Sequence, residues 1–148
     1  LRWSADGETI QTTWADGEET GPWVRKDAQG RRLEEGGLVA GVRTGTWTLW
    51  RVDGSKQGEG EYVAGKRAGT WRTISREGRT TSAAEYVKDC LHGSYLRFTP
   101  NGQMLARGRY EGGRRCGNWE FWNEDQSVNS EETGWYEADQ RTGPLRTP

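Results

Sequence analysis

The chain repeats itself every 24 residues, and this period constrains its fold more than any other feature. Three series of residues share the period. Glycines stand two residues before aromatic residues, at Gly21/Trp23, Gly45/Trp47, Gly69/Trp71, Gly93/Tyr95 and Gly117/Trp119. The second series is Trp14, Leu38, Tyr62, Tyr86 and Tyr110, and the third is Gly30, Gly54, Gly78 and Gly102. Three series in register over five periods indicate an array of structural repeats.

Each repeat is predicted to be a β-hairpin. The dipeptides Asp53-Gly54, Glu77-Gly78 and Asn101-Gly102 suit two-residue type I′ turns, which need positive φ at both positions. This interpretation gives two strands of about eight residues per repeat. Stretches such as Ala64-Gly65-Lys66-Arg67 would then turn the chain back, and no segment shows a helical period.

The turn positions predict how large and small residues face each other. The predicted turn places Trp47 opposite Gly60. Across the next loop, pairing Tyr62 with Gly69 brings Trp71 opposite the same Gly60. An indole that lies flat over a neighbouring strand needs a position without a side chain there. We therefore expect the Trp series to form the core on one face, with a second apolar row on the other face: Leu33, Trp50, Ile74, Phe98, Leu105 and Trp122.

The predicted fold is all-β: an elongated, single-layer antiparallel β-meander of about six 24-residue hairpin repeats, with about twelve strands. Residues 1–148 are expected to form one array. It divides into a truncated first repeat (1–20), regular repeats (21–44, 45–68, 69–92, 93–116) and an atypical C-terminal repeat and cap (117–148). Trp3 and Asp6-Gly7 are typical of the end of an earlier hairpin, so a longer native protein is expected.

The composition is unusual for a folded domain. Leu, Ile, Val and Phe account for 19 of 148 residues, and the mean hydropathy is -1.04. A net charge of -1 gives little self-repulsion, however, and nine Trp with five Tyr supply large buriable surfaces. No apolar stretch approaches the roughly 20 residues of a membrane helix, and the chain shows no signal peptide, so its compartment stays open.

The segments Gly45-Thr-Trp-Thr-Leu-Trp-Arg-Val-Asp-Gly54 and Glu61-Tyr-Val-Ala-Gly-Lys-Arg-Ala-Gly-Thr-Trp71 resemble MORN repeats. The pattern is similar to the bacterial variant labelled antitoxin-like: Gly-x-Trp, an Asn/Asp-Gly turn, and Tyr-x-x-Gly-Lys. The resemblance spans about residues 14 to 143. It implies an elongated β-meander with a role in binding or scaffolding, and it implies no catalytic residue.

Cations recur in the loops between the Tyr series and the next glycine, and stacked repeats would place them along one edge. As a binding surface, this row would contact phosphate headgroups or an acidic partner protein. As ordinary turn chemistry, it would only keep the loops soluble, and Glu18, Glu19 and Asp89 interrupt it. The candidate binding residues of this row are Arg43, Lys66, Arg67, Arg114 and Arg115.

Trp50, Phe98 and Trp122 are a second set of candidate binding residues, because Trp and other aromatic residues are favoured at protein interfaces. Their alternative role is packing within the sheet. Nucleic acid is not an expected partner, since 21 basic residues are balanced by 22 acidic ones.

Catalysis, a metal and a cofactor are not expected. The sequence Cys90-Leu91-His92 contains the single histidine, and no carboxylate is spaced to orient it. Cys90 and Cys116 should lie roughly 10 Å apart in adjacent repeats. A disulfide needs Cα atoms within about 7 Å, so two free thiols are favoured.

The expected function is a non-enzymatic scaffold for protein–protein interaction, through the sheet face and the basic loop edge. The partner would be another protein or another part of a longer native chain. Peripheral binding to anionic membrane surfaces and antitoxin-like inhibition of a partner enzyme are the alternatives. The end strand at Leu1 to Ala5 lacks Pro and Lys, so edge-to-edge self-association is a further expectation.

Overall fold

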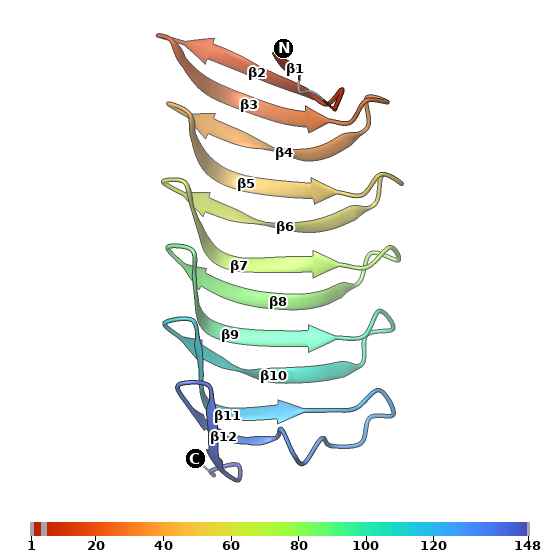
Figure 1. Ribbon diagram of the computed structural model, residues 1–148, viewed down its shortest axis with the longest axis vertical. Coiled ribbons are helices and arrows are strands. Elements are labelled where there is room, and N and C mark those ends of the chain that lie inside the picture. Colours follow the sequence, from red (N-terminus) through yellow and green to blue (C-terminus); the bar gives the residue numbers. More distant parts are fainter. Residues whose placement is uncertain (1, 4–5, 148) are drawn as a thin grey trace.

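The computed structural model describes residues 2–3 and 6–147, and these form one antiparallel sheet of thirteen strands in sequence order (Figure 1). The sheet is a single layer without crossovers, which confirms the predicted all-β meander. The strands are β1 (Arg2–Trp3), β2 (Thr9–Ala15), β3 (Glu18–Lys26), β4 (Arg32–Val39), β5 (Val42–Trp50), β6 (Lys56–Val63), β7 (Lys66–Ile74), β8 (Thr80–Val87), β9 (Cys90–Phe98), β10 (Met104–Glu111), β11 (Arg114–Phe121), β12 (Gly134–Glu137) and β13 (Gln140–Gly143).

One edge of the sheet, on the left in Figure 1, carries two-residue turns, and we call it the tight-turn edge. At Ala64-Gly65, which joins β6 to β7, both residues have positive φ, 48° and 77°. These angles are typical of the type I′ turn. The type I′ turns therefore lie in the loops that follow the Tyr series, and not at the dipeptides that the sequence pattern suggested.

The opposite edge carries longer turns, and we call it the bulged-turn edge. Here the predicted two-residue turn at Asp53-Gly54 is wrong, because only Gly54 has positive φ, 85°. The N–H of Gly54 donates to the carbonyl of Arg51 at 2.9 Å. The N–H of Arg51 donates to the carbonyl of Ser55, also at 2.9 Å. Asp53 favours this form because its carboxylate accepts the N–H of Ser55 at 2.9 Å. The result is a three-residue loop with a glycine bulge.

The predicted register is confirmed within the hairpins: Trp47 faces Gly60, and Trp71 faces Ala84. Between β6 and β7 it is confirmed beside Trp71, where Glu59 pairs with Arg72 and Gly60 lies against the Trp71 ring. It is wrong nearer the turn, because Tyr62 pairs with Arg67 instead of Gly69. The register then shifts at a bulge that contains Gly69, whose φ is 63°. A Cβ on Gly69 would meet no atom within 4 Å. This glycine series is therefore required by backbone conformation, and not by the neighbouring tyrosines.

The other small residues are required by the indole rings. A Cβ built on Gly36 or Gly60 would come within 2.2 Å of the ring of Trp47 or Trp71, respectively. Each Trp thus lies flat over the glycine of the preceding strand. Two of these positions are not glycine. Ala84 faces the smaller Tyr95 in β9, and Thr12 faces Trp23 in the first complete hairpin.

These rings form the core on one side of the sheet, which we call the aromatic face. Trp47 and Trp119 are each only 1% exposed. Trp47 joins Trp23 and Leu38 in one cluster, and Trp119 joins a second cluster nearer the C-terminus. The core expected for the Trp series is therefore present, and it depends on contacts between neighbouring repeats.

Main-chain hydrogen bonds connect successive turns along the tight-turn edge. In five of these turns, the N–H of the second turn residue donates to a main-chain carbonyl one repeat earlier, just after the previous turn. The bonds, at 2.7 to 3.1 Å, are Gly41 to Glu19, Gly65 to Arg43, Asp89 to Arg67, Gly113 to Leu91 and Asp139 to Arg115. At the bulged-turn edge, side chains link neighbouring turns instead, as from Arg76 to Asp53 at 3.0 Å. The two edges are thus connected in different ways.

The two ends of the sheet are irregular. The segment between β11 and β12 contains only an isolated bridge between Trp122 and Val128, and Gln126 takes the positive φ of the missing turn glycine, 67°. At the other end, Arg2 and Trp3 pair with Ile10 and Thr9. The rest of the predicted open strand, residues 1, 4 and 5, lies outside the described residues.

Candidate interaction surfaces

Arg43, the first residue of the predicted basic row, lies on the aromatic face. Its guanidinium group is 4.0 Å from the ring centroid of Trp47 and 2.7 Å from a carboxylate oxygen of Glu34. Glu34 is 7% exposed, and it also lies 3.6 Å from Arg25. Arg43 therefore covers the indole and neutralises a buried carboxylate, so its charge is largely used within the fold.

Arg67 and Arg115 follow a second, shared arrangement. The guanidinium carbon of Arg67 lies 4.2 Å from the ring centroid of Tyr86, and its Nε lies 3.3 Å from Asp89. Arg115 lies 4.5 Å from Tyr136 and 3.6 Å from Asp139 in the same way. The backbone N–H of Arg67, followed by its side chain, lowers the pKa of Asp89. These arginines therefore connect neighbouring turns.

Lys66 and Arg114 differ from the three arginines. They are the first residues of β7 and β11, they are exposed, and neither forms an ion pair with any residue that the structure describes. His92 of the same edge accepts the N–H of Gly112 at its Nδ1, at 3.3 Å. Of the five candidate residues of the predicted basic row, only Lys66 and Arg114 have no ion pair or cation–π contact among the described residues.

Trp50, Phe98 and Trp122 lie at or just beyond the ends of their strands, near the bulged-turn edge, and are half-buried. Arg32 lies over the ring of Trp50, 4.6 Å from its centroid. Arg43 and Trp50 are seven residues apart on β5, which corresponds to roughly 23 Å of strand. The structure therefore does not bring the two predicted sets of binding residues together.

The most exposed apolar row was not predicted. Val39, Val42, Val63 and Val87 are 59%, 43%, 60% and 51% exposed, and we call them the valine row. Val63 and Val87 follow Tyr62 and Tyr86 directly, so alternation along the strand puts them on the face opposite the aromatic face, which we call the outer face. The sequence carried this signal, because three of the four valines repeat with the period of 24.

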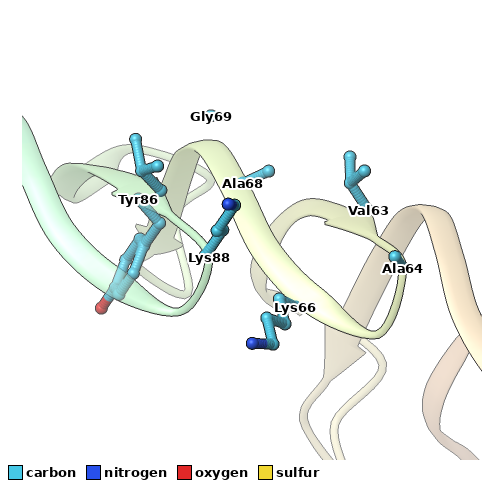
Figure 2. A pocket seen from close by; sticks show the side chains of 8 residues that line it. Val63, Ala64, Lys66, Ala68, Gly69, Tyr86 and Lys88 are labelled. Carbon is cyan, nitrogen blue, oxygen red and sulfur yellow. The ribbon is translucent and has the colours of Figure 1, made fainter.

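A recess of about 530 Å³ lies beside the valine row, between the β6–β7 turn and the β8–β9 turn (Figure 2). Val63 and Ala68 point to the same side of the ribbon there. Lysine side chains contribute to its polar part. Its lining residues are Val63, Ala64, Lys66, Ala68, Gly69, Tyr86, Val87 and Lys88.

Other chemistry is sparse among the described residues. No group of three or more His, Cys, Asp or Glu residues in this part of the chain could hold a metal ion. Cys90 and Cys116 are separate, half-buried thiols, and burial raises the pKa of Cys116. Residues 2–3 and 6–147 include no helix capable of spanning a membrane.

Comparisons with known proteins give no match, either among family models or among curated proteins.

Proposed function

We propose that this chain is a non-enzymatic repeat scaffold that binds another protein through the outer face of its sheet. The observation that carries the proposal is the valine row, in which four valines are between 43% and 60% exposed along one edge. Exposed apolar side chains that gather along one edge of a soluble protein can mark a site where a partner binds. In this chain they contribute little to the core, which lies on the aromatic face.

The arrangement of the repeats supports a binding role over catalysis. The array presents similar residues at each period, whereas an active site needs one unique set of convergent groups. The resemblance to MORN repeats, and to their bacterial antitoxin-like variant, also favours a binding role. Within this proposal, an inhibitor of a partner enzyme differs from a scaffold only in what the partner does.

Site-specific photo-crosslinking tests the proposal. A photoreactive amino acid at position 63, on the valine row, is expected to capture a distinct protein from an extract of the source cells. Capture should survive high salt, because salt screens interactions between exposed charges and does not weaken apolar contacts. Position 52 is the matched control, because Val52 is 57% exposed but lies at the bulged-turn edge. Equal capture from both positions, or none from position 63, would contradict the proposal.

The rival row at the bulged-turn edge needs its own variant. If Trp50→Ala abolishes capture while Val63→Ser does not, the partner contacts the row of Trp50, Phe98 and Trp122. That result would keep the scaffold function and move its binding site.

Binding to anionic membranes is the second candidate, and the free cations Lys66 and Arg114 favour it. The test is co-sedimentation with vesicles of phosphatidylcholine and phosphatidylserine, at low and high salt. The variant is Lys66→Ala/Arg114→Ala, because Arg115 is needed for its contacts with Tyr136 and Asp139. Salt-sensitive pelleting that this variant loses would replace the scaffold proposal with the membrane one.

A further inference from the structure

Building on the proposed function, we propose that the valine row and its recess bind an amphipathic α-helix of the partner, with acidic residues beside its apolar stripe. Three features of this surface favour such a helix: the spacing of the valines, the shape of the recess and the charges at its rim.

The spacing of the row matches a helix. Val39, Val63 and Val87 lie on β4, β6 and β8, so successive valines are two strands apart. At about 4.8 Å per strand this spacing is roughly 9.6 Å. Residues seven apart on a helix are separated by about 10.5 Å. A helix that crosses the strands along this edge can therefore place one apolar side chain at each valine.

The row also has a defined length. The equivalent positions in the flanking repeats are Ala15 and Glu111, which are a small residue and a charged one. From Val39 to Val87 the row crosses four strand intervals, or roughly 19 Å. That length corresponds to about 13 residues of helix, which is close to two heptads.

The recess has room for one large side chain of the helix. Its apolar walls come from Val63, Ala68 and Val87, and the turns before β7 and β9 lie on either side of it (Figure 2). A concave apolar site of this kind suits an inserted aliphatic side chain, as in other grooves that bind helices. A flat lipid surface would leave it unfilled.

The rim of the recess is positively charged. Lys66 and Lys88 both line it, and neither is ion-paired within the described part of the chain. Asp89, which follows Lys88 in the chain, is paired with Arg67 at 3.3 Å. Carboxylates that flank the apolar stripe of the helix would meet these two ammonium groups.

Two synthetic peptides test the proposal against the intact protein. Both are 18-residue helices with leucines at heptad positions a and d; one has glutamate and the other lysine at the flanking positions e and g. Fluorescence anisotropy is expected to show binding of the glutamate peptide and at least tenfold weaker binding of the lysine peptide. The double variant Val63→Ser/Val87→Ser should bind the glutamate peptide at least tenfold more weakly than the wild type. The matched control Val52→Ser should bind it as the wild type does.

A charge reversal makes the test specific. The variant Lys66→Glu/Lys88→Asp is expected to reverse the preference, so that the lysine peptide binds better. Asp is chosen because Asp16 holds the same turn position, with a φ of 52°. Circular dichroism confirms that each variant is folded. Equal binding of the two peptides, no binding of either, or no effect of the valine variant would overturn the proposal.

The outcomes also separate this inference from the proposed function. If position 63 captures a cellular protein but neither peptide binds, the scaffold function stands and the helical partner is wrong. If anionic vesicles bind and the peptides do not, both proposals fail.

Discussion

Adding a single methyl group at Gly60 is expected to destabilise the sheet strongly. An alanine Cβ there would lie 2.2 Å from Cδ2 and 2.3 Å from Cε2 of Trp71, far inside van der Waals contact. These atoms belong to a rigid ring, so the whole indole must move away. The backbone of Gly60 itself does not require glycine, since its φ is not positive.

The expected loss has two parts. Forcing an extra methyl group into a packed site costs about 1–3 kcal/mol. Displacing the ring also breaks the hydrogen bond from Nε1 of Trp71 to the carbonyl of Glu61, now 3.0 Å, which adds about 1 kcal/mol. Gly60→Ala should therefore lower the free energy of unfolding by roughly 2–4 kcal/mol. Gly36→Ala should cost more, because the ring it would displace, Trp47, is fully buried.

The chain itself suggests a rescue. Ala84 faces Tyr95, so an alanine is compatible with a tyrosine ring at this position of the repeat. Gly60→Ala/Trp71→Tyr should therefore be more stable than the sum of the two single changes predicts, by about 1 kcal/mol or more. Urea unfolding, followed by circular dichroism, measures all four proteins. Strict additivity, or a Gly60→Ala midpoint equal to that of the wild type, would refute the packing argument.

Three further predictions concern other parts of the fold. Gly69→Ala should cost about 1–2 kcal/mol because its φ is 63°, and Gly69→Asn clearly less, since Asn tolerates positive φ; equal urea midpoints for the two variants would contradict this. Arg43→Met should lower the stability by about 2–3 kcal/mol because it leaves Glu34 buried with a weaker partner. Adding Glu34→Gln should restore part of the loss, and an unchanged melting temperature of Arg43→Met would refute the pairing. The Ser55 hydroxyl, followed by its N–H and then by Arg76, lowers the pKa of Asp53 to about 2. Because the folded pKa lies below the unfolded value, the stabilisation by Asp53 is full above about pH 4 and is lost as the pH falls through about 2. An NMR titration should show this pKa rise in Ser55→Ala, and no rise would refute the role of the hydroxyl.

The repeat and the pairing of Trp47 with Gly60 could be predicted from sequence because they depend on period and residue size alone. The turn types could not. Both Asp53-Gly54 and Ala64-Gly65 end in glycine, and alanine is a poor sign of positive φ. The turn at Ala64 is joined to the neighbouring repeat by the main-chain hydrogen bond of Gly65 to Arg43. That contact is tertiary and has no local sequence signal.

The partners of the candidate binding residues could not be predicted from sequence either. The cations of Arg43 and Arg67 were recognisable from sequence, but their partners Glu34 and Asp89 lie 9 and 22 residues away along the chain. Only the fold reveals that these charges are already paired. The valine row has a visible period in the sequence. Whether Val63 is exposed or buried could not be predicted, however, because this depends on which face of the sheet is covered by the core.

The different connections at the two edges give the sheet unequal stiffness. Along the tight-turn edge, the hydrogen bond from Gly65 to Arg43 and its equivalents join rigid main-chain groups, so this edge resists stretching. The bulged-turn edge is joined by long side chains such as Arg76, which can change rotamer and length. In-plane bending of the strip will therefore open and close the bulged-turn edge while the other edge keeps its length. Because the valine row lies on the edge that resists stretching, the distances between its valines should change least as the molecule flexes.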